Sequence, residues 1–172
     1  MSTEKPQYTL MQASYTTYGD GNGAPCRSPS ITNQCAVRMS LALIRNGFSL
    51  DGFPNQGRIH RGRERCQLGD EPHLVGANEL HSYLRTLWGN GIHGRGRTVR
   101  TQILGQQGIV YFNNCFHRGT DAEGTNTGDH IDLWDGARIF NQILGISAGG
   151  SVAAGTDLFS RADNVRFFVL PS

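Results

Sequence analysis

The dipeptide Asp135-Gly136 lies between two short segments in which apolar and polar residues alternate, and it constrains the fold more than any other feature of the sequence. The flanking segments are residues 130–134 and 137–141. Asp-Gly in this context is a strong signal for a β-hairpin, because both residues accept the positive φ angles of a tight turn. The sequence therefore predicts two antiparallel strands here, with His130 directly opposite Asn141.

Periodic patterns elsewhere place helices in the first half of the chain and strands in the second half. Apolar residues recur at helical spacing over residues 35–47 and again over residues 77–88. Residues 108–112 form a nearly continuous apolar run, as in a central strand, and residues 165–170 form a last strand. Helices followed by strands predict an α+β fold in which the first helix packs on an antiparallel sheet.

Length and composition set broad limits on the molecule. The 172 residues fit a single catalytic domain, 1–172, in which we expect residues 1–30 to be a loop-rich N-terminal segment. The 23 glycines argue against a helical bundle, because glycine weakens helices and favours turns. A net charge of +2 is too small to indicate a nucleic-acid partner by itself. Because no apolar run is long enough to span a bilayer and the N-terminus is polar, we expect neither membrane insertion nor a signal peptide.

Cys35 is the most informative single residue, because it falls in the first turn of the first predicted helix. Unpaired backbone N–H groups and the positive end of the helix dipole favour a thiolate there, and the thiolate is the reactive form of cysteine. Such a group can attack an amide carbonyl, with the Cys35 backbone N–H as one oxyanion donor and Gln34 as a candidate for the second. The alternative is that Cys35 is a small buried core residue.

His130 provides a candidate base for that thiol. In the predicted hairpin register its Cβ lies about 4.5–5.5 Å from that of Asn141, whose carbonyl can accept a ring proton and fix the tautomer. Asp132 lies on the same face two residues along the strand and competes for this orienting role. Cysteine, histidine and an orienting residue form the catalytic set of papain-like thiol amidases.

The remaining cysteines and histidines show no spacing that is typical of a metal site. No two cysteines form a CxxC pair, and Cys26, Cys66 and Cys115 can supply one disulfide or stay free, which the spacing does not decide. We expect no metal and no cofactor. We also expect surface or loop positions for the five other histidines, which are at 60, 73, 81, 93 and 117.

Two segments resemble the type VI secretion amidase effectors of family 4. Residues 33–40, Asn-Gln-Cys-Ala-Val-Arg-Met-Ser, with Gly47-Phe48 after the helix, are similar to the nucleophile helix of that family. Residues 128–136, Gly-Asp-His-Ile-Asp-Leu-Trp-Asp-Gly, are similar to its histidine hairpin. The predicted helix and strand between them follow the family's order, so the resemblance spans about residues 30–141.

The resemblance implies a papain-like, NlpC-type fold and an antibacterial function. Family members are made in the bacterial cytoplasm without a signal peptide and are delivered by the type VI machinery to the periplasm of target cells. They cleave the γ-D-glutamyl–meso-diaminopimelate amide of peptidoglycan stem peptides, and a cognate immunity protein blocks their active site. The family's nucleophile matches Cys35 and its base matches His130. Its third residue is an aspartate at the position of Asn141, so this departure keeps Asp132 open as the orienting residue.

Two other functions stay open at the level of sequence. Arginines concentrate in two stretches and can form a surface that binds nucleic acid or another polyanion: 58, 61, 63, 65, 95, 97 and 100. In that case Cys35 is only a core thiol. Alternatively, the same catalytic residues in the same fold can serve a thiol protease or a deamidase that acts on proteins.

Overall fold

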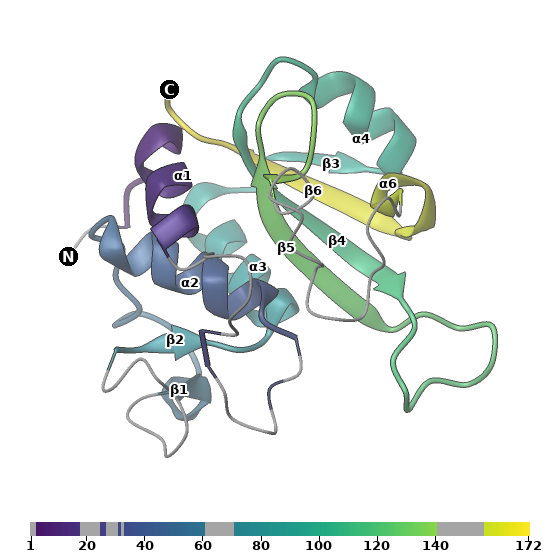
Figure 1. Ribbon diagram of the computed structural model, residues 1–172, viewed down its shortest axis with the longest axis horizontal. Helices are drawn as coiled ribbons and strands as arrows, with labels where there is room; N and C mark the ends of the chain where they lie inside the picture. Colours follow the sequence, from purple (N-terminus) through teal and green to yellow (C-terminus); the bar gives the residue numbers. More distant parts are fainter. Residues whose placement is uncertain (1–2, 18–24, 27–30, 32, 61–70, 141–156) are drawn as a thin grey trace.

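The computed structural model describes residues 3–17, 25–26, 31, 33–60, 71–140 and 157–172 of the chain. These residues form a mixed structure of helices and antiparallel strands, so the predicted α+β class is confirmed (Figure 1). The elements follow one another as α1 (Tyr8–Thr17), α2 (Cys35–Arg45), the 3₁₀ turn η1 (Gln56–Arg58), β1 (Ile59–His60), β2 (His73–Leu74), α3 (Ala77–Trp88), β3 (Ile92–Gly94), α4 (Gly96–Ile103), β4 (Gly108–Phe116), β5 (Gly128–Trp134), α6 (Leu158–Arg161) and β6 (Asn164–Val169).

The main sheet has four strands in the order β3-β6-β4-β5. Strand β4 is central because it pairs with β5 on one side and with β6 on the other, and most of its residues are buried. The predictions of a central strand at 108–112 and a last strand at 165–170 are therefore confirmed, and β4 continues to Phe116. Pairing with β4 places His130 opposite Phe112 and fixes the position of β5.

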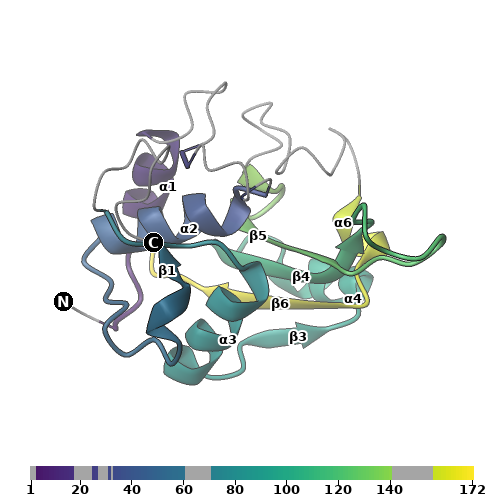
Figure 2. The ribbon, with the colours of Figure 1, turned by 90° about the horizontal axis from the view of Figure 1, so that it is seen from below.

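Helices cover both faces of this sheet. One face carries Ile109 and Ile131 in a core shared with α1, α2 and α3, while the other carries Phe112 and Trp134 in a core shared with α4 and α6. In Figures 1 and 2, α1 and α2 lie together on one side of the molecule, and β1 and β2 form a separate small sheet below α2. Burial of both faces explains why the strands read as apolar runs in the sequence.

Both predicted long helices are present with the expected ends. Helix α2 is buried from Cys35 to Leu43, as expected for a helix that is enclosed rather than laid on a surface. It ends at Arg45, and the φ of 83° at Gly47 permits the N–H of Phe48 to reach the carbonyl of Leu43 at 3.1 Å. Helix α3 ends in the same way before Gly89, whose φ is 79°.

Two helices, α1 and α4, were not predicted from the sequence, and α1 lies in the segment that was expected to be loop-rich. Within residues 1–30, α1 buries Tyr8, Met11 and Tyr15 completely, and the N–H of Tyr8 donates to the carbonyl of Pro171 at 2.7 Å. The expectation of a loop is thus wrong over α1. Helix α4 lies in a glycine- and arginine-rich stretch in which the sequence predicted no helix. Apolar residues at i, i+3 and i+7 were the available signal in α1, although the segment is polar on average.

The predicted two-residue hairpin at Asp135-Gly136 is also wrong. The Asp135 carboxylate accepts backbone N–H bonds from Ala137 at 2.8 Å and from Arg138 at 2.6 Å, which folds a wider turn. Trp134 then bridges to Ile139 rather than to Ala137. The two-residue register therefore fails at Trp134, and Asn141, which it placed opposite His130, lies outside the described residues.

Two histidines lie deeper than expected. His73 is fully buried and His81 is 8% exposed, so the expectation of surface or loop positions is wrong for both. The His81 ring stacks on Tyr111 at 4.0 Å between centroids, and burial lowers its pKa to about 4. Cys26 and Cys115 are buried free thiols, while Cys66 lies outside the described residues. Among the helices that the structure describes, none has the length and apolar character needed to cross a bilayer.

Gly108 provides a test of how tightly the central strands are packed. A Cβ atom at this position would lie 2.2 Å from the carbonyl oxygen of Phe168 and 2.7 Å from the ring of Phe167. We expect Gly108→Ala to lower the free energy of unfolding by about 2–3 kcal/mol, because backbone atoms cannot move aside cheaply. Chemical denaturation measures the change.

Gly119→Ala is the matched control, because nothing lies within 4 Å of the added Cβ. It should change the unfolding free energy by less than about 0.5 kcal/mol. Equal stability of the two variants would show that β4 and β6 do not approach each other as described.

Candidate active site

Cys35 is the first residue of α2 and lies against the main core with 3% of its surface exposed. Its backbone N–H donates to the side-chain oxygen of Asn33 at 3.1 Å. This bond satisfies one of the N–H groups that a helix start leaves unpaired. The nucleophile candidate is thus held at a helix N-terminus, as the sequence predicted, by a neighbour two residues earlier.

The side chain of Gln34 fixes the chain segment that leads into this helix. Its oxygen accepts the N–H of Cys26 at 3.1 Å, and its NH₂ group donates to the carbonyls of Cys26 and Ile31, each at 2.9 Å. Both hydrogens of the amide are therefore used within the protein. The Gln34 side chain is an anchor in this structure, although we considered it as an oxyanion donor on sequence grounds.

His130 and Asp132 form a buried pair on β5. The His130 Nε2 and Asp132 Oδ2 atoms lie 3.2 Å apart, and neither residue is exposed. The other carboxylate oxygen, Oδ1, accepts the backbone N–H of Leu133 at 2.8 Å. Of the two candidates for orienting the imidazole, Asp132 contacts it directly, whereas Asn141 lies outside the described residues.

Electrostatics favour the protonated form of His130. Burial by itself lowers the pKa of His130, but the charge of Cys35, the hydrogen bond to Asp132 and the contact with the Cys35 side chain together raise it well above its ordinary value. Asp132 takes Nε2, and Nδ1 is buried with no hydrogen-bond partner among the described residues, so Nδ1 is the ring nitrogen that is left for the thiol. The arrangement therefore favours the imidazolium form of His130 beside the Cys35 side chain.

Tyr15 and Arg38 are two further residues of this site that sequence analysis missed. Burial raises the pKa of Tyr15 well above its ordinary value, and the charges of Asp132 and Cys35 raise it further, so its hydroxyl stays neutral. Arg38 follows Cys35 by three residues on α2, is 7% exposed, and lowers the pKa of Tyr15 through its positive charge. The burial of Arg38, which the sequence alone does not reveal, is what shows that its charge needs partners.

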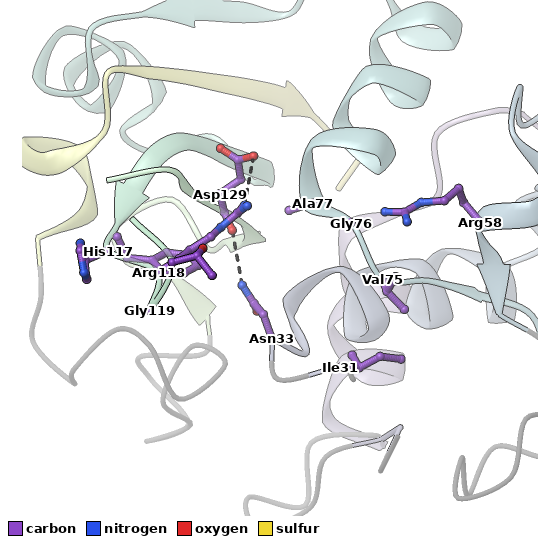
Figure 3. Close-up of a pocket in the computed structure, with 12 residues that line it drawn as sticks. Ile31, Asn33, Arg58, Val75, Gly76, Ala77, His117, Arg118, Gly119 and Asp129 are labelled. Carbon is purple, nitrogen blue, oxygen red and sulfur yellow. Dashed lines mark hydrogen bonds and ion pairs between the residues drawn. The ribbon is translucent and has the colours of Figure 1, made fainter. Parts of the chain in front are cut away.

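A cleft of about 510 Å³ adjoins the site through Asn33 and Asp129, and its lining residues do not include Cys35 or His130 themselves (Figure 3). Asn33, which binds the Cys35 amide, lies in it, and so does Asp129, the neighbour of His130. In Figure 3 the Asn33 side chain points toward the backbone of Asp129, where its nitrogen lies 3.5 Å from the carbonyl oxygen. The cleft is lined by Ile31, Asn33, Arg58, Val75, Gly76, Ala77, Phe116, His117, Arg118, Gly119, Thr120 and Asp129.

Two arginines give this cleft a positive character. Figure 3 shows Arg58 and Arg118 approaching from opposite sides. Arg58 pairs with Glu79 at 2.8 Å and Arg118 with Asp129 at 3.9 Å, and about half of each arginine side chain is exposed. Anionic groups of a ligand can therefore contact both guanidinium groups. Such contacts leave no buried charge unpaired, because both arginine side chains are half exposed.

Cys115 is a second buried thiol that we expect to be unreactive, and its surroundings can be compared with those of Cys35. Burial raises the pKa of Cys115 far above its ordinary value, and the charges of Cys35 and Asp129 raise it further. It has no imidazole contact of the kind that Cys35 makes with His130. A thiol at a helix start, a raised-pKa imidazole and a buried carboxylate form the set that thiol-based acyl transfer requires.

Comparisons with known proteins agree with this reading. A family model described as Tae4, type VI secretion system (T6SS), amidase effector protein 4, matches residues 31–168. No curated protein matches the sequence.

Solved structures of similar fold include the type VI effector Tae4 from Enterobacter cloacae, at TM-score 0.64 and 16% identity over 99% of both chains. Tae4 from Salmonella typhimurium, in complex with the immunity protein Tai4 from Enterobacter cloacae, has TM-score 0.62 and 16% identity over 97% of this chain and 100% of that chain. The Tae4–Tai4 complex from Enterobacter cloacae has TM-score 0.61 and 18% identity, covering 97% and 99%. At these identities the likeness concerns the fold, and it confirms the predicted papain-like, NlpC-type architecture.

Alkylation of Cys35 distinguishes the two candidates for the orienting residue. We expect Asp132→Asn to slow the reaction of Cys35 with iodoacetamide at neutral pH by about tenfold, because losing the negative charge beside His130 weakens the proposed thiolate–imidazolium pair by about the equivalent of one pKa unit. Asn141→Ala should leave the rate unchanged. Mass spectrometry of the labelled cysteine peptides gives both rates, with Cys115 as the unreactive internal reference. The reverse pattern, slow alkylation in Asn141→Ala only, would assign the orienting role to Asn141.

Proposed function

The chain belongs to the family of type VI secretion system amidase effector protein 4, and we propose that it is an antibacterial enzyme that hydrolyses peptidoglycan stem peptides through Cys35. Family membership makes it an amidase, which is a hydrolase. The observation that carries the finer proposal is the buried His130–Asp132 pair with Cys35 beside it, next to a positively charged cleft. The proposed bond is the amide between the γ-carboxyl of D-glutamate and meso-diaminopimelate.

In the proposed acylation step, the Cys35 thiolate adds to the carbonyl carbon of that amide. His130, as the imidazolium, donates its Nδ1 proton to the amine nitrogen of diaminopimelate, which leaves as the C–N bond breaks. The γ-glutamyl group remains on the Cys35 sulfur as a thioester. Throughout this step Asp132 accepts the Nε2 hydrogen and keeps the ring in one orientation.

In the proposed deacylation step, neutral His130 removes a proton from a water molecule that attacks the thioester. The C–S bond breaks, the γ-carboxylate is released, and Cys35 and His130 return to their starting states. The Cys35 N–H is the proposed donor to the oxyanion in both steps. It now binds Asn33, whose side chain lines the cleft and would have to turn toward substrate.

The charge of the cleft supports an anionic peptide as substrate. Stem peptides carry free carboxylates next to the proposed amide, and Arg58 and Arg118 offer two guanidinium groups on opposite sides of the cleft. Charge-assisted contacts of this kind orient a flexible peptide as well as attract it. Protein substrates, which the same catalytic residues could serve, do not need this pair of positive groups.

We also propose an inhibitory partner and a route of delivery. Solved structures of Tae4 from Enterobacter cloacae and from Salmonella typhimurium include complexes with the immunity protein Tai4. By analogy, a cognate immunity protein made by the producing cell would cover the cleft of this chain. The type VI machinery would deliver the chain to the periplasm of target cells, where its substrate lies.

Digestion of purified muropeptides tests the proposed function. We expect the wild-type chain to separate diaminopimelate-containing fragments from γ-glutamyl fragments, with the cut position read by mass spectrometry. Cys35→Ala should give no detectable product, and His130→Ala should lower kcat by roughly 10³-fold, because it removes the general base. Cys115→Ala, which alters another buried thiol, should keep its activity. The cognate immunity protein should stop the reaction.

Two outcomes would contradict this account. Cleavage by both the wild type and Cys35→Ala would mean that another residue is the nucleophile. Intact muropeptides with every variant would reject the cell-wall substrate. In that case, protein cleavage or deamidation and salt-sensitive polyanion binding become the functions to test.

A further inference from the structure

A second cluster of reactive side chains lies outside the proposed active site. The ligand atoms of Cys26, His60 and His73 all lie within 4.8 Å of one another. His60 and His73 are directly paired across β1 and β2, with ring centroids 5.6 Å apart. Cys26 precedes α2 in the chain, and its backbone is hydrogen-bonded to the Gln34 side chain. The cluster therefore brings together three separate parts of the chain.

Burial and hydrogen bonding indicate that the cluster is an organised site and not a chance grouping of surface side chains. Cys26 and His73 are fully buried, and His60 is half-buried. The Nδ1 atom of His73 lies 3.0 Å from the carbonyl oxygen of Glu71. When Nδ1 donates to this carbonyl, the lone pair is on Nε2, and metal-binding histidines are commonly oriented in this way by a backbone oxygen.

We propose that Cys26, His60 and His73 bind one divalent transition-metal ion of the zinc class. A thiolate and two neutral imidazoles are the ligands that zinc prefers, with a Zn–S distance of about 2.3 Å and Zn–N distances of about 2.0–2.1 Å. Ligand atoms less than 4.8 Å apart need only small side-chain rotations to reach that geometry. The fourth position of the tetrahedron is left to water or another ligand.

The position of the cluster gives the metal a structural role. Arg58 precedes His60 by two residues and Val75 follows His73 by two residues, and both line the active-site cleft. Cys26 is bound through its backbone to Gln34, which precedes Cys35. A metal ion bound by these three residues would connect one wall of the cleft to the start of helix α2, which carries Cys35. The inference does not depend on which amide the enzyme cleaves.

Metal binding by the full-length chain tests the proposal directly. The reduced protein is titrated with zinc against a chromophoric chelator, and cobalt(II) is added in a parallel experiment. We expect one equivalent of zinc per chain, and a cobalt complex with a thiolate-to-metal charge-transfer band and tetrahedral ligand-field bands. Cys26→Ser should abolish the charge-transfer band, and His60→Asn or His73→Asn should weaken zinc binding by at least about a hundredfold.

Cys115→Ser and His93→Asn are the matched controls, because neither residue belongs to the cluster. Both should bind zinc like the wild type. His60 is half-buried, so His60→Asn gives a result even if a fully buried variant fails to fold, which circular dichroism shows. Absence of stoichiometric zinc in the wild type, or equal binding by the wild type, Cys26→Ser and His60→Asn, would overturn the proposal.

Discussion

The contact between His130 and Asp132 is the interaction on which the rest of the site depends. Both side chains are fully buried, and a buried carboxylate without compensation costs several kcal/mol. Asp132 gains that compensation from the His130 ring at 3.2 Å and from the N–H of Leu133 at 2.8 Å. Because both residues lie on one strand at i and i+2, the pairing of β5 with β4 fixes them as a unit. The other elements of the site must place the Cys35 thiol beside the His130–Asp132 pair.

Helix α2 supplies the thiol, and its environment explains how Cys35 is held there. The helix is enclosed on most sides, so its position is fixed by packing rather than by propensity. Asn33 and Gln34 then fix its first turn, one through the Cys35 amide and the other through Cys26 and Ile31. The same anchor connects the nucleophile to the Cys26–His60–His73 cluster. Catalysis and the proposed metal therefore share one short segment of chain.

Sequence reasoning succeeded where the signal was local and failed where it depended on tertiary contacts. The periodicity of α2 and α3 and the apolar runs of β4 and β6 survive in the structure because both sets of residues are buried. Helix α1 was missed because three buried residues carry its signal within a polar segment. The hairpin register failed because the Asp135 carboxylate binds two backbone N–H groups and so forms a wider turn than the Asp-Gly pair alone predicts.

The site was predictable to a similar extent. Cys35 and His130 were identifiable from a helix start and a strand motif, and Asp132 was one of two candidates for the third position. The contributions of Tyr15 and Arg38 come from burial, which spacing does not show. The Cys26–His60–His73 cluster has no recognisable spacing, because its members are brought together by the pairing of β1 with β2 and by the Gln34 anchor.

The protonation state of His130 tests the central claim most directly. Ring-nitrogen NMR of histidine-labelled protein, followed through a pH titration, reports whether one or both nitrogens carry a hydrogen. The account predicts that His130 is doubly protonated at neutral pH in the wild type. Its pKa should fall in Cys35→Ala, because the charge of Cys35 is removed while burial still lowers the pKa. A neutral His130 ring at pH 7 in the wild type, or the same pKa in both proteins, would contradict the proposed thiolate–imidazolium pair.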